Sequence, residues 1–497
     1  MKNDNQINIS YLNLAVQSPS LELNFSVSEE ICNKSKNSKH IIYMCDSALD
    51  SCSVNLLKRK SICRICTHKA KKGFKIFNER NPNSELRKIT KKDFKNLKKP
   101  QLSSEIYNEI LYGVHSTIST HLRLDNMDLL NRTWKSIKNK MISSSTNLFH
   151  FFNQELTNYK VENFVIFNGR INCARPLSLI SKLHNVNYTL FDGNINGRIP
   201  VIAKNEMFHS INFQKVQSIK SYLKNFKESK NLAEEYMHRK INKIEVDDHA
   251  YIKDQITGHI DLEILEYSKP IITIYVSSDD EYRFLGNDWN EYGIVDQIDC
   301  IKEINNSDLS KKYAIIVKMH PNQKHLHNSI KKRYVDLSKE VKVLFPENKT
   351  DTYSLLMKSE LIINFCSTVG IEANYLRKPV VQIGPSRFRE LPGANYVSNS
   401  KEAISMILNE KYKLMPIRAS IIYFTFYMKD VHKLKAYEYI EDGVYKYGGK
   451  SLNISLFLRI SAVVDKITSH ILTGNKSIYS NIFLHLNNLI FNTTKVK

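Results

Sequence analysis

The stretch SELIINFCSTVGIEANYLRKPVVQIG, from Ser359 to Gly384, decides the fold of the second half of the chain. Its apolar run Leu361–Phe365 is β-branched and too short for a helix, as is typical of a buried parallel strand. A turn is expected at Cys366-Ser367-Thr368 and a short helix from about residue 369 to residue 376. A second strand opens at Pro379, so the stretch predicts a strand–helix–strand unit.

Ser367 and Thr368 stand where the expected helix begins, and both residue types commonly cap a helix N-terminus. Gly370 has no β-carbon, so the first helical turn can approach a ligand closely. Free backbone N–H groups, hydroxyls and the positive end of a helix dipole together form an anion site. From these residues alone, phosphate binding and an ordinary helix cap are equally good interpretations.

Polar residues follow each predicted strand in the second half of the chain. The strands are Ile271–Val276, Ala314–Met319, Val341–Phe345, Leu361–Phe365 and Pro379–Ile383, and helical patterns separate most of them. This alternation predicts a parallel, doubly wound sheet, whose strand ends emerge at one edge. The residues after the strands are Ser277-Ser278-Asp279-Asp280, His320-Pro321, Pro346-Glu347, Cys366-Ser367-Thr368 and Gly384-Pro385. Together they predict a diphosphate site.

His320 and the Asp279-Asp280 pair each have a functional and a plain interpretation. As a cation or donor to a phosphate, His320 would stabilise a departing nucleotide, whereas the alternative is a surface histidine beside a proline. The two aspartates suggest a metal ion, but adjacent side chains of an extended chain point to opposite sides. We therefore expect no metal at this site.

The first half of the chain also alternates between strands and helices. Ile7–Val16 and His40–Met44 are expected as strands around a helix at Leu21–Cys32, which predicts an α/β domain. We expect residues 1–250 to form this domain, with a basic, cysteine-containing insertion at 45–100. Residues 268–413 form the second domain, and residues 414–497 form a helical tail that packs back on the domains.

Two strand ends of the first domain carry further candidate residues. Strand Val161–Phe167 leads into Asn168-Gly169-Arg170, and strand Asn187–Phe191 leads into Asp192-Gly193. Asn and Arg at a strand end suit recognition of hydroxyl or carboxylate groups, and Asp192 is a candidate general base. The alternatives are a structural ion pair for Arg170 and a plain turn at Asp192.

The composition is that of a globular protein, with 42% hydrophobic and 25% charged residues in 497. No apolar run approaches the roughly 20 residues that a membrane span requires. The first residues, MKNDNQINIS, lack the charged-then-apolar order of a secretory signal. We therefore expect a cytoplasmic protein.

The net charge of +22 is concentrated in one region. Between Lys58 and Lys99 there are 16 Lys and Arg residues against three acidic residues, a net charge of +13. Such a run suits nucleic acid, an anionic membrane face or a polyanionic substrate, or forms a solvated loop. Aromatic residues are sparse in it, which favours the inner face of the cell membrane over nucleic acid.

Four of the eight cysteines lie close together in the sequence, at Cys45, Cys52, Cys63 and Cys66. Cys63 and Cys66 have the spacing of a zinc knuckle, but Cys45 and Cys52 are too far apart to mirror it. The alternatives are a structural zinc ion and reduced, partly buried thiols.

Four segments resemble the capsule and surface-polysaccharide biosynthesis glycosyltransferases of bacteria, which have the two-domain GT-B fold. They are VIFNGRINCARPLSLI (165–180), TIYVSSDDEYRFLGNDWNEYGIVDQ (273–297), VKMHPNQ (317–323) and DTYSLLMKSELIINFCSTVGIEANYLRKPVV (351–381). Their order and spacing also match, and the resemblance extends over about Ile41 to Gly449. Arg377-Lys378-Pro379 departs from the more usual Gly-Lys-Pro, so that turn is expected to differ in shape.

The resemblance implies an α/β GT-B fold, with two Rossmann-like, doubly wound domains facing an interdomain cleft. It implies a metal-independent glycosyltransferase that takes a UDP- or CMP-linked sugar and extends a glycan or lipid-linked glycan at the membrane, beside other polysaccharide assembly enzymes. Asp192 and His320 would be catalytic, and Asn168 and Arg170 would bind the acceptor. The implied donor-binding residues are Ser277, Ser278, His320, Ser367, Thr368, Gly370 and Glu372, the last contacting the ribose or sugar.

Three other functions remain as alternatives. The first is a related enzyme of the same fold, a glycerophosphotransferase or nucleotide-sugar 2-epimerase. The second is a nucleic-acid-binding protein, which would explain the charge of +22. The third is a non-catalytic subunit of the polysaccharide assembly machinery.

Overall fold

The computed structural model describes residues 3–35, 38–194, 199–244, 254–429, 432–441, 443–454 and 456–473. The chain divides into two compact units. Unit 1 comprises the chain up to Leu122, Asn126–Phe208 and the chain from His432, whereas unit 2 comprises Arg123–Asp125 and His209–Val431. The sequence placed the boundary near residue 250. The structure places it at 208 because the next two helices pack on a later helix of unit 2.

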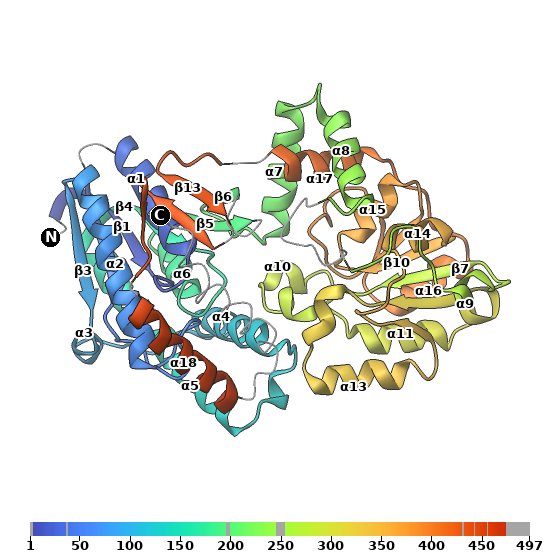
Figure 1. Ribbon diagram of the computed structural model, residues 1–497, viewed down its shortest axis with the longest axis horizontal. Helices are drawn as coiled ribbons and strands as arrows, with labels where there is room; N and C mark the ends of the chain where they lie inside the picture. Colours follow the sequence, from blue (N-terminus) through green and yellow to red (C-terminus); the bar gives the residue numbers. More distant parts are fainter. Residues whose placement is uncertain are drawn as a thin grey trace. The chain divides into compact units, whose positions relative to one another are not determined.

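Unit 1 is built on a six-stranded sheet with the order β3-β2-β1-β4-β5-β6 (Figure 1). The strands are β1 (Asn3–Leu12), β2 (Lys39–Cys45), β3 (Ser84–Ile89), β4 (Tyr159–Phe167), β5 (Asn187–Asn194) and β6 (Ile199–Lys204). All neighbouring pairs are parallel except β5 and β6. The helices are α1 (Ser20–Lys34), α2 (Lys60–Arg80), α3 (Lys91–Lys95), α4 (Ser104–Leu122), the 3-10 helix η1 (Met127–Leu129), α5 (Arg132–Asn158) and α6 (Arg175–Leu183).

Helices cover both faces of this sheet, as a parallel sheet requires. Ile42 and Met44 of β2 pack in one apolar cluster with Phe25 of α1 and Phe77 of α2. The intervening Tyr43 contacts Phe152 of α5, with ring centroids 5.4 Å apart. Alternate residues of β2 therefore pack against the helices on opposite faces of the sheet.

Residues 45–100 are not an insertion, contrary to the prediction. Helix α2 is the crossover between the parallel strands β2 and β3, so this region is part of the sheet's own framework. The high lysine and cysteine content obscured its helical period, although Ile65, Ile76 and Phe77 are buried at helical spacing.

Unit 2 contains a second six-stranded sheet, entirely parallel, with the order β12-β11-β10-β7-β8-β9. The strands are β7 (Ile271–Tyr275), β8 (Ala314–Lys318), β9 (Lys342–Leu344), β10 (Leu361–Phe365), β11 (Val380–Ile383) and β12 (Asn395–Val397). The helical elements are α7 (Ile211–Lys224), α8 (Ser229–Ile241), α9 (Leu262–Leu265), η3 (Asp279–Glu281), α10 (Asn287–Asn290), α11 (Gln297–Asn305), α12 (Leu309–Lys312), η4 (Pro321–His325), α13 (Asn328–Leu337), α14 (Thr352–Lys358), α15 (Val369–Tyr375), α16 (Ser400–Leu408) and α17 (Arg418–Lys429).

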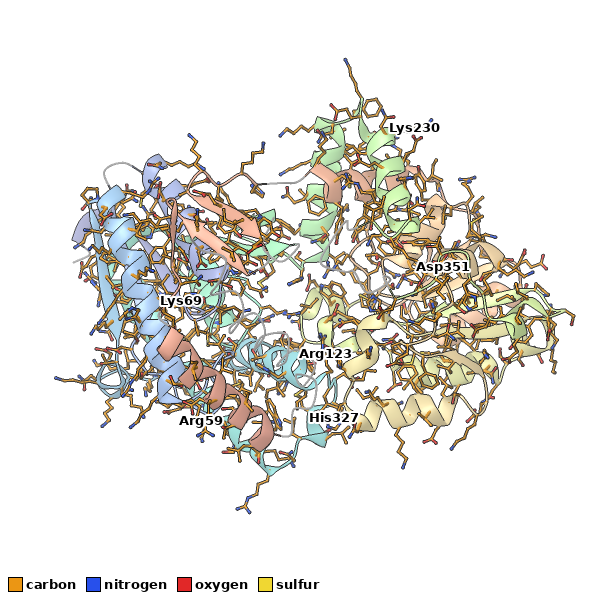
Figure 2. All side chains as sticks on the ribbon, viewed as in Figure 1. Arg59, Lys69, Arg123, Lys230, His327 and Asp351 are labelled. Carbon is orange, nitrogen blue, oxygen red and sulfur yellow. The ribbon has the colours of Figure 1, made fainter. Side chains whose placement is uncertain are left out.

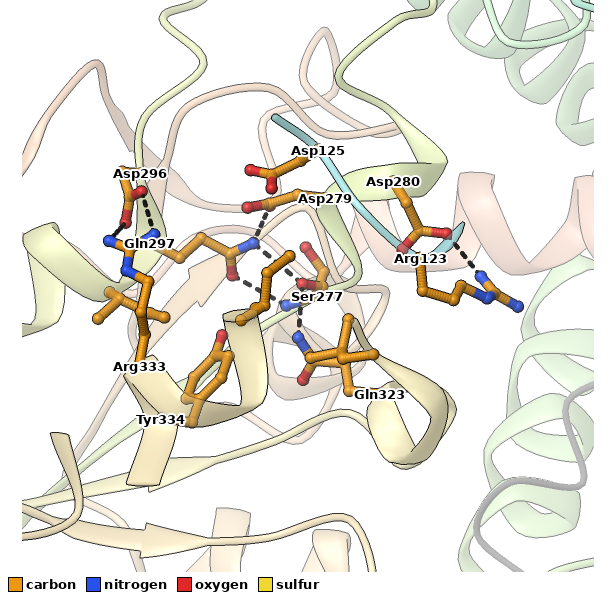
Figure 3. A pocket seen from close by; sticks show the side chains of 13 residues that line it. Arg123, Asp125, Ser277, Asp279, Asp280, Asp296, Gln297, Gln323, Arg333 and Tyr334 are labelled. Atoms are coloured by element: carbon orange, nitrogen blue, oxygen red, sulfur yellow. Dashed lines mark hydrogen bonds and ion pairs between the residues drawn. The ribbon is translucent and has the colours of Figure 1, made fainter. Parts of the chain in front are cut away.

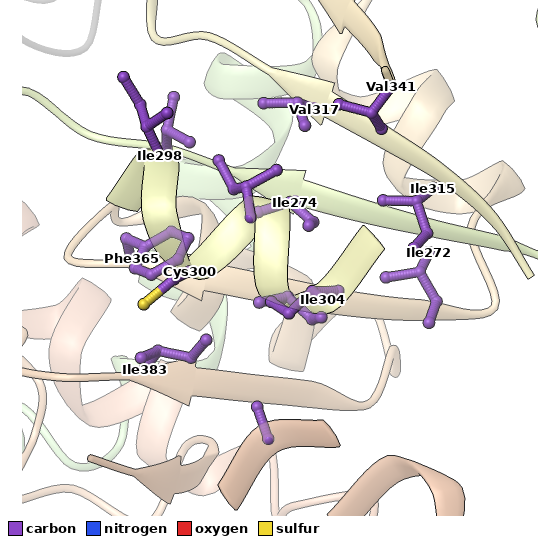
Figure 4. Packing of buried hydrophobic residues seen from close by; sticks show 14 of the residues in the cluster. Ile272, Ile274, Ile298, Cys300, Ile304, Ile315, Val317, Val341, Phe365 and Ile383 are labelled. Carbon is purple, nitrogen blue, oxygen red and sulfur yellow. The ribbon is translucent and has the colours of Figure 1, made fainter. Parts of the chain in front are cut away.

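This sheet also has an apolar core on each face. Ile274 and Ile363 pack with Ile298 and Ile304 of α11 (Figure 4). Ile362, the neighbour of Ile363 in the chain, packs in a separate cluster with aromatic residues of α8 and α17. The predicted doubly wound sheet is therefore confirmed, and β12 is a further strand that the sequence did not reveal.

The last part of the chain is divided between the units and is not purely helical. Helix α17 packs on α7 and α8 of unit 2. The antiparallel strands β13 (Tyr437–Glu441), β14 (Val444–Tyr447) and β15 (Lys450–Ser451) and helix α18 (Leu456–Thr473) belong to unit 1. Residues 474–497 of the predicted tail lie outside the described residues. No helix among the described residues is long and apolar enough to cross a bilayer.

Candidate functional site

The carboxyl edge of the unit 2 sheet holds Ser277 and Ser278, directly after β7. Gln297, the first residue of α11, fixes the main chain of Ser277 from both sides (Figure 3). The Ser277 N–H donates to Gln297 Oε1 at 3.0 Å, and Gln297 Nε2 donates to the Ser277 carbonyl at 2.9 Å. Gln323 Nε2 donates to the same carbonyl at 3.1 Å. The strand end is therefore held rigidly by two glutamine side chains.

The serine hydroxyls that are buried at this edge without a hydrogen-bond partner among the described residues include the Oγ atoms of Ser278, after β7, and Ser386, after β11. Both residues are buried, with exposures of 4% and 0%. A buried hydroxyl left unpaired costs about 1–3 kcal/mol, so a water molecule, an ion or a ligand that bonded to these groups would stabilise the protein.

His320 follows β8 and caps the 3-10 helix η4. Its Nδ1 accepts the N–H of Asn322 at 3.1 Å, while its own backbone N–H donates to Gln323 Oε1 at 2.9 Å. With Nδ1 acting as an acceptor, the proton of the neutral ring must sit on Nε2. The ring is thus oriented with Nε2 as its donor, as binding of a phosphate oxygen requires.

The turn Cys366-Ser367-Thr368 joins β10 to α15 as predicted. Cys366 has a φ of 42°, a left-handed conformation, and burial raises the pKa of its thiol while nearby Arg387 opposes that rise. Ser367 Oγ accepts the N–H of Val369 at 3.4 Å. Thr368 makes no side-chain capping bond. Thr368 is thus the N-cap of α15 by position, while Ser367 supplies the side-chain bond to its first residue.

Arg387 brings a guanidinium to the same turn, and the sequence analysis did not identify it. Its Nη1 donates to the Tyr427 hydroxyl of α17 at 3.2 Å. Arg387 could have been identified from the sequence, because it lies three residues after Gly384, just beyond the carboxyl end of β11. Asn364 was also missed: it lies inside β10, and its Nδ2 donates to the Ser367 carbonyl at 2.8 Å.

Gly370 and Glu372 are both engaged with the protein itself. A β-carbon on Gly370 would lie 2.6 Å from Asn364 Nδ2 and 3.1 Å from Phe388. Close packing therefore explains why a glycine stands at this position. Glu372 is 2% exposed, and its two oxygens accept the hydroxyls of Tyr236 and Tyr353 at 3.1 and 3.0 Å. Contact between Glu372 and a donor sugar would require one of these bonds to break, and that role stays a prediction.

Asp279 and Asp280 have different partners, although they lie in the 3-10 helix η3 and not in the extended chain that the prediction assumed. Asp280 forms an ion pair with Arg123 at 2.7 Å, whereas Asp279 accepts from Gln297 (Figure 3). Asp279 also accepts from the Tyr282 hydroxyl. Burial, and secondarily repulsion from Asp125, raises the pKa of Asp279 to about 7. These groups line a cavity of about 20 Å³ beside Ser277.

In unit 1 the predicted acceptor residues lie together. Asn168 Nδ2 donates to Asp192 Oδ2, and the Gly193 N–H donates to Asp192 Oδ1 at 2.8 Å. Burial raises the pKa of Asp192, against the opposing effects of Asn168, Gly193 and Arg170. Asp192 is not in a plain turn, because β5 continues through it and pairs with Val201 of β6.

The four clustered cysteines do surround one cavity of unit 1, of about 30 Å³, together with Tyr11 and Asn55. Burial raises the pKa of Cys45 to about 11 and also raises those of Cys52, Cys63 and Cys66, although for Cys52 the neighbouring Cys173 is the larger cause. Among the described residues, no group of three or more His, Cys, Asp or Glu side chains is placed to hold a metal ion. Zinc at these thiols stays a prediction.

Two Rossmann-like units, the second with a polar edge at its carboxyl strand ends, define an α/β protein of GT-B-like architecture. Residues 201–405 match the capsule polysaccharide biosynthesis protein family. No curated protein matches the chain significantly.

Several solved structures are similar to this chain. The beta Kdo 2,4 transferase of Thermosulfurimonas dismutans KpsC is 16% identical, with a TM-score of 0.33 over 55% of this chain and 85% of that chain. The beta Kdo 2,7 transferase of the same protein is 10% identical, with a TM-score of 0.31 over 53% and 75%. UDP-GlcNAc 2-epimerase from Neisseria meningitidis is 10% identical, with a TM-score of 0.28 over 85% and 94%.

Proposed function

We propose that the chain is a glycosyltransferase that moves a sugar from a nucleotide-sugar donor to a capsule or other surface polysaccharide. The observation that carries this proposal is the set of polar groups at the carboxyl edge of the unit 2 sheet, within the stretch that matches the family. The buried hydroxyls of Ser278 and Ser386 would each gain a partner from a bound phosphate. Open parallel sheets bind their ligands at this edge.

In the transfer, the acceptor hydroxyl loses its proton to a base, for which Asp192 is the candidate, as its oxygen attacks the anomeric carbon of the donor sugar. The bond between that carbon and the phosphate oxygen breaks, and the nucleotide leaves with the bonding electrons. His320 Nε2 and the Arg387 guanidinium would stabilise the negative charge on the leaving phosphate. The raised pKa makes Asp192 a stronger base than an ordinary aspartate.

Binding of nucleotide sugars to the full chain tests the donor site directly. We expect one member of a panel of UDP-, CMP-, GDP- and CDP-linked sugars to stabilise the protein against heat, since a ligand at about 100 times its Kd adds roughly 2.7 kcal/mol. His320→Ala should abolish that stabilisation. His259→Ala is the matched control, because His259 is a half-exposed residue of unit 2 that pairs with Asp261.

Two results would contradict the proposal. One is an unchanged response of the His320 variant to the donor. The other is conversion of the bound nucleotide sugar without any acceptor, which would identify an epimerase instead.

A further inference from the structure

Helix α2 carries a stripe of basic side chains along its exposed face. Its members, here called the α2 stripe, are Lys60, Arg64, His68, Lys71, Lys72 and Lys75, all exposed. Their spacings of three and four residues place them on one side of the helix. The opposite side, with Ile65 and Phe77, is buried in unit 1.

The acidic residues of the same region have other partners, so they do not neutralise the positive charge of the α2 stripe. Glu79 pairs with Lys450 at 3.2 Å, Glu85 pairs with Lys39 at 2.6 Å, and Asp93 accepts from Thr90. Among the described residues, Lys60, Arg64, Lys71 and Lys75 have no acidic partner. The positive charge of α2 therefore faces solvent.

Helix α18 lies against α2 and adds apolar side chains to the same part of unit 1 (Figure 1). It is joined to the start of α2 by the bond from Ser61 to Asp465 and by Arg59 Nε, which donates to Ser469 Oγ at 3.3 Å; Arg59 is labelled in Figure 2. Away from these contacts, Ile460, Val464 and Leu472 are 53%, 57% and 57% exposed. They recur at intervals of four and eight residues, and they form the α18 row.

We propose that the α2 stripe and the α18 row together form a docking surface for an anionic lipid bilayer. Basic side chains attract anionic headgroups, and an aliphatic row on a neighbouring helix can insert between headgroups and acyl chains. Nucleic acid explains the stripe but not the row, because it is held by phosphate contacts and by stacking on aromatic rings. This surface is defined by unit 1 alone and does not depend on the chemistry of the donor site.

Flotation of the full chain with lipid vesicles tests the docking surface. We expect binding to phosphatidylcholine vesicles that contain about one third phosphatidylglycerol, and at least about tenfold weaker binding to phosphatidylcholine alone. Changing Lys60, Arg64, Lys71 and Lys75 to Gln should weaken binding at least about tenfold, since each basic residue contributes to the attraction. The control changes four exposed lysines of unit 2 to Gln, namely Lys331, Lys332, Lys358 and Lys401, and should bind as the wild type does.

A second variant separates the bilayer from other polyanions. Ile460→Ser combined with Val464→Ser should weaken vesicle binding and leave any retention of DNA or RNA unchanged. Equal binding of the stripe variant and its control would overturn the proposal. So would wild-type binding to nucleic acid without binding to the anionic vesicles, which would assign the stripe to nucleic acid. Circular dichroism of each variant shows that it is folded.

Discussion

Asp279→Asn is expected to remove a pH dependence from the stability of unit 2. An unfolded aspartate has a pKa of about 3.9, whereas in the folded protein the pKa of Asp279 is raised to about 7. Between these two values the folded carboxyl keeps a proton that the unfolded chain has released. The folded state thus binds more protons, and the free energy of unfolding falls as pH rises from about 4 to about 7.

The size of the effect follows from the difference between the two pKa values. Each unit is worth about 1.4 kcal/mol, so roughly three units amount to about 4 kcal/mol lost by pH 8. The charged and titratable groups around this carboxyl are Asp125, Arg283, Tyr282, Tyr334 and Cys366. Asn keeps an oxygen that can accept the bond from Gln297, so the substitution mainly removes the charge.

Urea denaturation at pH 5 and pH 8 measures the effect. Trp289 lies in unit 2, stacked on Tyr282 at 5.9 Å, so in a Trp134→Phe background its fluorescence reports on this unit. The gain in stability from Asp279→Asn should be about 3 kcal/mol larger at pH 8 than at pH 5.

Asp296→Asn is the control, with the opposite sign. Arg333 offsets the cost of burial and lowers the pKa of Asp296, so this carboxylate stabilises the fold above the unfolded pKa and loses that effect as pH falls. Its removal should therefore destabilise unit 2 near neutral pH. An Asp279→Asn difference that is the same at both pH values would refute the reasoning, because it would mean that Asp279 ionises as it does in water.

Three further outcomes are expected. Gly370→Ala should lower the free energy of unfolding by about 1–3 kcal/mol in urea denaturation, because its β-carbon meets Asn364 at 2.6 Å; an unchanged value would show that the turn relaxes freely. Arg377→Gly should raise it by about 1 kcal/mol, because Arg377 has a φ of 61°; a loss would mean that the Arg377 side chain contributes more than the strain costs. Asp192→Asn should reduce sugar transfer about 10²–10⁴-fold without weakening donor binding, and wild-type transfer should decline as pH falls through the raised pKa of Asp192; weakened donor binding would contradict its role as a base.

The strand–helix–strand unit at Ser359–Gly384 was predictable because each of its elements has a local signal. Strand β10 has the predicted bounds, and α15 ends within one residue of the expected position. Arg377 has a φ of 61°, in the left-handed region that favours glycine. A turn shape different from that of Gly-Lys-Pro stays a prediction.

The elements that were missed have weak or contradictory local signals. Strand β12 contains only three residues, too few for a clear alternating pattern. Helix α2 buries Lys69 and Gly73 along with its apolar residues, and a lysine rarely marks a core position. Gly73 is there because a β-carbon would lie 2.2 Å from Phe25 of α1.

The candidate site was predictable where its residues follow strands, and it was not where they come from elsewhere. Ser277, His320 and Ser367 were identified by their places after β7, β8 and β10. Gln297 starts a helix, and the partners of Glu372 include Tyr236, which lies 136 residues earlier in the chain. Contacts over such separations leave no local pattern in a single sequence.

The return of the chain to unit 1 after residue 431 has a consequence for synthesis. Leu434, Tyr447 and Leu452 are buried in the clusters around α1, so this core contains residues that leave the ribosome late. Residues 209–431, by contrast, contain the whole parallel sheet of unit 2. Domains tend to fold as soon as their residues emerge. During translation, unit 1 can therefore complete its core only after Leu434, Tyr447 and Leu452 have emerged, later than the last strand of the unit 2 sheet.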